Sequence, residues 1–287
     1  MTSRERVFEA MAHREPDRVP VMCQLAIGHY FLNTGIAPHR VWFTSEGFAE
    51  ALLELRDRYR FDGILVNLPG RDPDWMRDVA GIEPDCGGER VRWKNGDITV
   101  IPGDDNAAHR FADPGSEGRP DFGRLDPDHL EALDRFPTYT WSVYHTPFLS
   151  RKANPGPFAK PEDIPEYFTC MLDLVREAVG GAVSVHGEVF SPFTHYMELF
   201  GYESGLMGLV DDPGRAEAFL DRLTPASIAW AVTQARRGAD AILISSAFAG
   251  GWFVSRANYR RFVMPLERRV AEAVHDEGIP GYVHTCG

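Results

Sequence analysis

The chain has 287 residues, of which 44% are hydrophobic and 25% charged, a composition typical of a folded globular protein that excludes wholesale disorder. Its 30 basic and 42 acidic residues give a net charge of -12, which opposes binding to nucleic acid or to an anionic membrane surface. No run of about 18 apolar residues is present, so we expect no transmembrane helix.

The first part of the chain alternates short apolar runs with amphipathic helices. Thr2 and Glu5 have the spacing of a capping box, and Pro16 marks the end of the helix that they start. Apolar runs and a helical period then predict a strand, a helix and a second strand, as in a βαβ unit. The expected elements are a helix over 3–13, a strand over 19–23, a helix over 44–59 and a strand over 62–67.

The middle of the chain departs from this alternation. Residues 89–101 alternate in polarity around Asn95-Gly96, which predicts a β-hairpin insertion. Two segments rich in Gly, Pro and Asp, 103–124 and 145–161, are expected to be long loops.

The second half returns to strands that alternate with helices, which predicts parallel βαβ units. Pro265 is expected to kink the last of these helices. The expected strands lie near 140 and at 182–186, 240–245 and 281–285, and the expected helices at 162–179, 213–236 and 255–276.

Several short motifs carry a resemblance to a known family. They are Arg4-Glu5-Arg6-Val7, Pro16-Asp17-Arg18-Val19-Pro20, the stretch 188–194 (Glu-Val-Phe-Ser-Pro-Phe-Thr), Leu199-Phe200-Gly201 with Asp212-Pro213, Gly238-Ala239-Asp240-Ala241-Ile242, Ser255, Tyr259-Arg260-Arg261-Phe262, Pro265, and His284-Thr285-Cys286-Gly287. In content, order and spacing they resemble the uroporphyrinogen decarboxylase superfamily. Residues 100–160 contribute nothing to the resemblance.

The resemblance implies an α/β fold of the (β/α)₈, or TIM-barrel, type. We expect a single domain over residues 1–287 with about six parallel strands, an incomplete barrel, plus the β-hairpin insertion. Relatives continue with two more βα units after the His-x-Cys-Gly strand. Without them the barrel would have open edges and an exposed apolar patch, so we expect either a fragment or closure by a second chain, as in a homo-oligomer.

The superfamily contains the decarboxylases of tetrapyrrole synthesis and zinc-dependent methyltransferases that move a methyl group between a corrinoid and a thiol. The decarboxylases bind a polycarboxylate with arginines in an Arg-Gln-Ala-Gly-Arg-Tyr stretch. The matching residues 25–30 read Leu-Ala-Ile-Gly-His-Tyr and contain no arginine. The decarboxylases' catalytic aspartate also has no match, because the strand ends Val66-Asn67. The methyltransferase branch is therefore favoured.

A zinc site is implied by the methyltransferases' His-x-Cys-Gly motif, present here as His284, Cys286 and Gly287. Residues two apart in a strand point to the same side, so His284 and Cys286 can face one metal ion. Relatives supply a second cysteine downstream as third ligand. Cys23 is either a substitute for that ligand or a small core residue.

The remaining cysteines, Cys86 and Cys170, are expected to be structural. None of the four cysteines forms a Cys-x-x-Cys pair, which favours reduced thiols in a cytoplasmic protein.

Other candidate site residues follow from their places at strand ends. His186 and Glu188 share one face near the carboxyl end of a strand, where barrel enzymes place their chemistry, and are candidate catalytic residues; a backbone-bonded His and a surface Glu are the alternative. The candidate substrate-binding residues are His29, Tyr30, Asn67 and Trp252. Tyr259, Phe262 and Leu266 are expected to pack in the core.

Three functions stay open at this point. The first is a zinc-dependent methyltransferase that takes a methyl group from a corrinoid, free or on a corrinoid protein, or from a small methyl donor, to a thiol. The second is uroporphyrinogen decarboxylation. The third is a non-catalytic truncated homologue or partner-binding subunit. We expect a small-molecule substrate for either enzyme. Under none of the three functions do we expect nucleic acid or a membrane as a partner.

Overall fold

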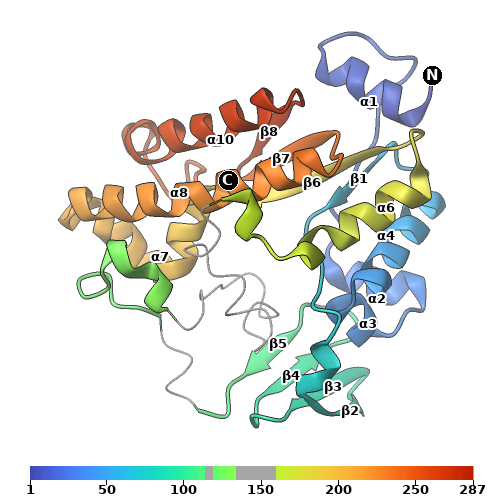
Figure 1. Cartoon of the computed structure of the whole chain (residues 1–287), viewed down its shortest axis with the longest axis horizontal. Coiled ribbons are helices and arrows are strands. Elements are labelled where there is room, and N and C mark those ends of the chain that lie inside the picture. Colours follow the sequence, from blue (N-terminus) through green and yellow to red (C-terminus); the bar gives the residue numbers. More distant parts are fainter. Residues whose placement is uncertain (114–118, 134–159, 287) are drawn as a thin grey trace. The chain divides into compact units, whose positions relative to one another are not determined.

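The computed structural model describes residues 1–113, 119–133 and 160–286, which form two compact units (Figure 1). Unit 1 comprises Met1–Ala112, Glu166–Gly187 and Arg236–Ala241, and unit 2 comprises Asp113–Pro165, Glu188–Ala235 and Ile242–Gly287. Strands β6 (Ser184–Phe190) and β7 (Ala241–Ser245) each begin in unit 1 and end in unit 2. That the whole chain is one domain stays a prediction.

The helices of unit 1 are α1 (Ser3–Met11), α2 (Ile27–Thr34), α3 (Pro38–Phe43), α4 (Ser45–Tyr59) and α6 (Cys170–Val179), with 3-10 helices at Trp75–Asp78 and Glu166–Thr169. The predicted capping box is present at the start of α1, where the Thr2 hydroxyl accepts from the Glu5 N–H and the Glu5 carboxylate accepts from the Thr2 N–H. The helix expected over 44–59 is α4, with Thr44 as its N-cap. Both predictions are confirmed.

Unit 2 contains α7 (Pro192–Asp211), α8 (Pro213–Arg236, apart from its last residue), α9 (Arg256–Asn258), α10 (Met264–Asp276) and β8 (Gly281–His284), with 3-10 helices at Pro127–Ala132 and Pro161–Asp163 and a π-helix at Tyr259–Val263. The helix expected over 255–276 is divided: α9, the π-helix and α10 follow one another without a gap, and Pro265 is the second residue of α10. The irregular, π-helical part lies directly before Pro265, whose missing N–H cannot continue the α-helical hydrogen bonds of that segment.

Four strands make a parallel sheet in the order β1-β6-β7-β8, where β1 is Gly63–Val66. Gly63 to Val66 pair with Ser184 to Gly187, and Ile242 to Ser245 pair with Gly281 to His284. These strands confirm the expected strands at 62–67, 182–186, 240–245 and 281–285. The strand expected near 140 lies outside the described residues.

The strand expected over 19–23 is wrong, because these residues form no regular structure. Pro20 has no N–H to donate to a sheet, and Val19 and Val21 are exposed. Val21 is nevertheless tied to the start of β1, since its C=O accepts from the Asp62 N–H at 2.7 Å. Of the six expected parallel strands, five fall within the described residues, and four of these five are present.

The predicted hairpin is present but belongs to a larger antiparallel sheet. Its strands, in the order β2-β3-β4-β5, are Val79–Asp85, Gly88–Trp93, Ile98–Ile101 and Ala108–Arg110. The β3–β4 turn contains Asn95 and Gly96, and Gly96 has a positive φ of 91°. Strand β5 lies within the segment expected to be a long loop, so that expectation is corrected there.

The helix expected over 162–179 is also corrected. The structure has two 3-10 turns, and α6 begins only at Cys170. Pro161 and Pro165 explain the delay, because a proline lacks the N–H that a continuous helix would need.

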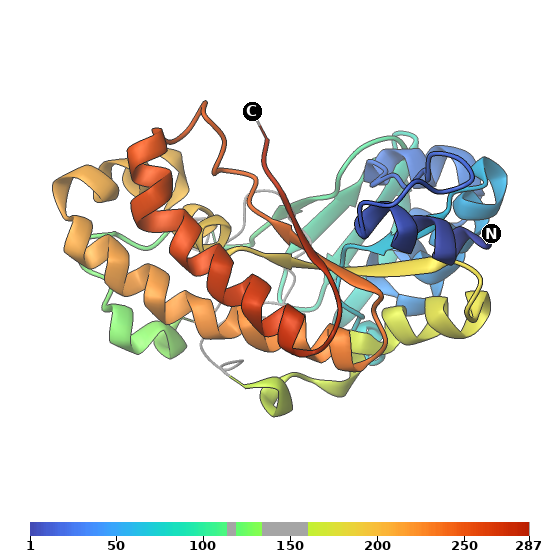
Figure 2. The ribbon, with the colours of Figure 1, turned by 90° about the horizontal axis from the view of Figure 1, so that it is seen from above.

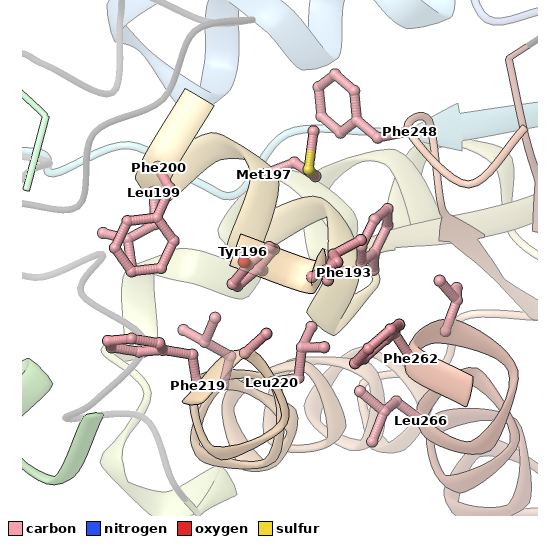
Figure 3. Close-up of a cluster of buried hydrophobic side chains, with 14 of the residues drawn as sticks. Phe193, Tyr196, Met197, Leu199, Phe200, Phe219, Leu220, Phe248, Phe262 and Leu266 are labelled. Carbon is pink, nitrogen blue, oxygen red and sulfur yellow. The ribbon is translucent and has the colours of Figure 1, made fainter. Parts of the chain in front are cut away.

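The core of unit 2 lies among α7, α8 and α10 (Figure 3). Its large buried side chains include Phe193, Tyr196, Leu199 and Phe200 from α7, Phe219 and Leu220 from α8, and Phe262 and Leu266 from the π-helix and α10. In Figures 1 and 2, α10 runs beside α8, and an ion pair of 2.8 Å joins Arg269 to Asp221 between them. Tyr259, Phe262 and Leu266 pack in or against this core, as expected.

The amino ends of the strands in unit 1 are fixed by two buried carboxylates. Asp62, just before β1, accepts hydrogen bonds from Arg6 and Arg18. Asp240, just before β7, accepts from Arg4 and Arg176. In barrels this end of the sheet serves stability rather than chemistry, which points to the opposite end for function.

Helix α7 is interrupted at Gly201, whose φ of 76° and ψ of 178° are accessible to glycine but strained for other residues. A Cβ there would also lie 3.2 Å from Cδ of Arg119. We expect Gly201→Ala to lower the free energy of unfolding by about 2 kcal/mol, measured by urea denaturation. Gly214→Ala, where the nearest atom would be 3.8 Å away, is the control. Equal losses in both variants would contradict this account.

Candidate active site at the carboxyl end of the parallel sheet

Polar side chains gather where β6, β7 and β8 end within unit 2. Backbone hydrogen bonds join these ends: the Ser191 N–H donates to the Ser245 C=O at 2.9 Å, and the Ser246 N–H donates to the His284 C=O at 2.8 Å. The carboxyl ends of parallel strands are where barrel enzymes place catalytic groups. The carboxyl ends of β6, β7 and β8 are therefore the candidate active site.

The pair His284 and Cys286 lies at the end of β8. The Nε2 atom of His284 is 3.2 Å from Sγ of Cys286, and both side chains are exposed. A tetrahedral zinc ion with ordinary Zn–N and Zn–S bonds would separate two such atoms by about 3.6 Å, so a small side-chain adjustment would admit it. The donor types and their spacing fit two ligands of a zinc ion.

A third ligand for such an ion is not evident. Over the residues that the structure describes, no group of three or more His, Cys, Asp or Glu side chains is arranged to hold a metal. Cys23, the suggested substitute, is exposed and its thiol is 3.6 Å from its neighbour's C=O, so its interpretation as a core residue is wrong. Its segment forms no strand, which explains why its side chain is not packed inside.

Glu188 is the buried acid of the site. Its side chain is 6% exposed, and burial raises the pKa of its carboxyl to about 7, although a hydrogen bond with Ser245 acts in the opposite direction. Tyr282 on β8 is affected by the charge of Glu188: burial and this charge both raise the pKa of the Tyr282 hydroxyl. A carboxyl with a pKa near neutrality can take up or release a proton under physiological conditions.

The geometry connects Glu188 with the His284 end of the sheet through one intermediate strand. Glu188 on β6 bonds to Ser245 on β7, and Ser245 is the register partner of His284 on β8. Register partners in a sheet project to the same side. Glu188, Ser245 and His284 therefore share one face at the ends of three consecutive strands.

The 188–194 motif now has a structural explanation. Ser191 caps α7 by accepting from the Thr194 N–H, and its hydroxyl also lies 2.9 Å from that of Ser246. The Thr194 hydroxyl donates to the Ser245 C=O at 2.9 Å, and Phe193 is fully buried in the core of unit 2. The motif thus locks the end of β6 to the end of β7 and positions Glu188.

His186 lies on the same face of β6 as Glu188, two residues closer to the amino end of the strand. Its Nε2 is 2.9 Å from the Ser184 hydroxyl. Burial lowers its pKa to about 4, with the nearby charge of Asp240 opposing the shift, so the imidazole is neutral at physiological pH. Catalytic roles for His186 and Glu188 stay predictions.

The four candidate substrate-binding residues fall on different units. Trp252 is in unit 2, in the turn after Gly251, and is 87% exposed. Asn67 follows β1 in unit 1 and is half-buried. His29 on α2 pairs with the Tyr59 hydroxyl at 2.8 Å, whereas Tyr30 is 3% exposed and packs against Phe48. Substrate contact stays a prediction for all four, and burial does not favour it for Tyr30.

Sequence reasoning missed Ser245, Tyr282 and Gln234. Alternation along the strands offers a signal for two of them, since Tyr282 is two residues before His284 and Ser245 is the last residue of β7. Gln234 could not be found this way. It lies on α8 and reaches the site only through tertiary packing.

Comparison with known proteins connects this site to one family. The family model for uroporphyrinogen decarboxylase (URO-D) matches residues 136–287, just over half of the chain. The chain is 29% identical over 116 residues to a methylated-thiol–coenzyme M methyltransferase of Methanosarcina mazei, a match that covers 40% of this chain and 31% of that protein. It is also 29% identical to a uroporphyrinogen decarboxylase of Anaeromyxobacter dehalogenans, over 98% of this chain and 70% of that protein.

A further relative is a methylcobamide:CoM methyltransferase of Methanosarcina barkeri, 27% identical over 55% of this chain and 45% of that protein. Among solved structures, a methyltransferase from Methanosarcina mazei matches all of this chain and 70% of its own, with a TM-score of 0.61 and 20% identity. Together the family match and this structural likeness show a TIM-barrel-like α/β fold, and so confirm the expected fold class. None of the described helices is long and apolar enough to cross a membrane.

Proposed function

This chain belongs to the uroporphyrinogen decarboxylase (URO-D) family, whose members are enzymes, and from that premise we propose that it is a zinc-dependent methyltransferase that delivers a methyl group to a thiol. The methyl group would come from a corrinoid, free or on a corrinoid protein, or from another small methyl donor. The observation that carries the proposal is the His284–Cys286 pair, with Nε2 and Sγ 3.2 Å apart at the end of β8.

His284 and Cys286 would hold the zinc ion, with a third ligand from a group still to be identified. Zinc bound there would lower the pKa of a coordinated substrate thiol, so that its sulfur is deprotonated near neutral pH. A histidine nitrogen and a cysteine sulfur suit this metal better than they suit magnesium or calcium, which prefer oxygen ligands.

Glu188 would handle the proton of the substrate thiol. Because burial raises its pKa to about 7, an ionised Glu188 can accept that proton and then release it to solvent. The sulfur then forms the new S–CH₃ bond with its own electron pair, while the bond from the methyl group to its donor breaks and its electrons stay with the donor. Ser245 would hold the Glu188 carboxyl in place, and His186, neutral and buried, would support the same face of β6.

Substrate contacts would come from exposed groups, with Trp252 the leading candidate in unit 2. Decarboxylation is less well supported, because residues 25–30, which correspond to the arginine-bearing stretch of the decarboxylases, carry no arginine. That activity, like a non-catalytic role, is an outcome of the test below.

Zinc binding by the purified chain tests the proposal. We expect Cys286→Ser to weaken zinc affinity on the order of tenfold or more, as measured by competition with a chromogenic chelator, because oxygen is a poorer partner for zinc than thiolate sulfur. Cys86→Ser is the matched control, since Cys86 is also exposed but lies in the β2–β3 turn. It should leave the affinity unchanged.

The same proteins are then assayed for methylation of coenzyme M by methylcobalamin and for decarboxylation of uroporphyrinogen. Methylation that depends on Cys286 supports the proposal. Tight zinc binding that survives Cys286→Ser, or decarboxylation without methylation, would reject it.

A further inference from the structure

We propose that Gln234, on α8, is a positioning residue that fixes Glu188 at the carboxyl end of β6. The inference rests on the proposed function insofar as Glu188 carries the proton of the thiol. It adds a residue that neither the family motifs nor the strand patterns indicate.

Two hydrogen bonds connect the side chain of Gln234 to the backbone of Glu188. The Glu188 N–H donates to Oε1 of Gln234 at 3.2 Å, and Nε2 of Gln234 donates to the Glu188 C=O at 2.9 Å. The amide therefore bonds both polar groups of one residue, as a neighbouring strand would. Gln234 is only 2% exposed, so water cannot easily replace it.

Glu188 needs these two hydrogen bonds because it lies one residue beyond the point where the pairing of β1 with β6 ends. Strand β1 pairs with β6 only as far as Val66 and Gly187. The next residue, Glu188, still has a buried N–H and C=O, and such groups require partners. Gln234 supplies both at the residue whose carboxyl lies in the candidate site.

A second contact from the same helix shows that α8 holds this part of β6 in place. The Ser227 hydroxyl donates to the Phe190 C=O at 2.9 Å. Ser227 and Gln234 are seven residues, or two helical turns, apart and so lie on one face of α8. The end of β6 is thus held at residues 188 and 190, on either side of Val189.

This fixation matters for chemistry because a proton acceptor works only at hydrogen-bond distance from its substrate. A misplacement of about 1 Å can reduce a rate about a hundredfold. With its Cα fixed by Gln234 and its carboxyl bonded to Ser245, Glu188 has little freedom to drift. Gln234 acts through Glu188 and does not touch the reacting atoms.

The test replaces Gln234 by methionine, which keeps the length of the side chain and removes both hydrogen bonds. Thr233→Val is the matched control, because Thr233 is the adjacent residue of α8 and its hydroxyl has no hydrogen-bond partner within the described part of the chain. Gln234→Glu is a milder variant that keeps an acceptor for the Glu188 N–H.

Two measurements report on Glu188 without any assay of activity. Amide hydrogen exchange at Glu188 is expected to accelerate at least tenfold in Gln234→Met, while exchange at Ser246, whose N–H bonds to His284, stays unchanged. The ¹³C resonance of the Glu188 carboxyl, assigned with Glu188→Gln, is expected to move in Gln234→Met and to stay in place in Thr233→Val.

Turnover is the third measurement. We expect the kcat for methyl transfer to fall about tenfold in Gln234→Met and less in Gln234→Glu, with zinc affinity and the KM for the thiol within twofold of the wild type. Unchanged exchange and an unchanged carboxyl resonance would overturn the proposal, as would an unchanged kcat in an active enzyme. If the wild type transfers no methyl group but both spectroscopic effects appear, positioning by Gln234 stands and the proposed function fails.

Discussion

Replacing Asp240 by alanine is expected to lower the free energy of unfolding by about 3 kcal/mol. Asp240 is 3% exposed and accepts hydrogen bonds from Arg4, Arg176 and the N–H of Val185. Its loss would leave that N–H without a partner and two guanidinium groups without their anion. The partial exposure of both arginines keeps the expected loss at the lower end of the range for buried ion pairs.

The loss should depend on pH in a defined direction. Burial alone would raise the pKa of Asp240, but hydrogen bonds from Arg176, Arg4 and Val185 outweigh it and lower the pKa below its ordinary value of 3.8. The charged carboxylate therefore stabilises the folded state above about pH 4, and this contribution disappears as the pH falls through the lowered pKa. The free energies of unfolding of the wild type and of Asp240→Ala should therefore converge at acidic pH.

Chemical denaturation of both proteins at pH 7 and at several pH values below 3.5 measures this effect, because the lowered pKa keeps the folded-state carboxylate charged until the pH falls well below its ordinary value. Asp221→Ala is the control, because Asp221 also pairs with an arginine, Arg269, but on an exposed surface. Its expected loss is below about 1 kcal/mol. A loss of similar size in both variants would mean that burial of Asp240 contributes little.

The elements that sequence patterns predicted correctly are those with strong local signals. The Thr2–Glu5 capping box, the Thr44 cap and the Asn95-Gly96 turn each fix a boundary within a few residues of chain. The segment 19–23 failed because an apolar run is compatible with a strand only if a neighbour accepts its hydrogen bonds, and Pro20 weakens that pairing.

The candidate site was predictable to the extent that it follows strand period. The interval of two residues correctly indicated that His284 and Cys286 come together, and the place of Glu188 indicated a strand end. Gln234 depends on how α8 packs against β6, which no local pattern specifies. The burial of Tyr30 likewise follows from the packing of α2 against α4.

Two buried carboxylates, Asp240 just before β7 and Glu188 on β6, have opposite electrostatic environments. Asp240 is surrounded by arginines, so its pKa falls. For Glu188, burial is the largest influence and raises the pKa of its carboxyl to about 7, while a hydrogen bond with Ser245 opposes the rise. The first arrangement favours a permanent charge that stabilises the fold, whereas the second favours a group that changes its protonation near neutral pH.

For Glu188 this environment has a thermodynamic consequence. A rise in pKa from 4.5 to about 7 corresponds to at most roughly 3 kcal/mol of folding free energy. Because the folded state holds the proton more tightly, Glu188 does not destabilise the fold at acidic pH, where its carboxyl is protonated in both states. The destabilisation grows as the pH rises above the pKa of Glu188 in the unfolded chain, and it is complete above the pKa in the folded protein.

Glu188→Gln is therefore expected to be more stable than the wild type at pH 8 by roughly 2 to 3 kcal/mol, and by less than about 1 kcal/mol at pH 5. The neutral amide keeps the shape of the protonated acid and can still bond to Ser245, but it cannot ionise. His186 and His195, whose pKa values burial lowers to about 4, also make stability vary with pH. Their effects are common to both proteins and cancel in the difference between them.

The measurement is urea denaturation of both proteins at pH 5, 6, 7 and 8. The difference in stability should grow with pH, and methyl transfer should be lost in the same variant, because glutamine cannot accept the proton of the thiol. Stability curves that stay parallel over this range would show that Glu188 is ionised throughout. Glu188 would then be a fixed charge rather than the proton acceptor of the site.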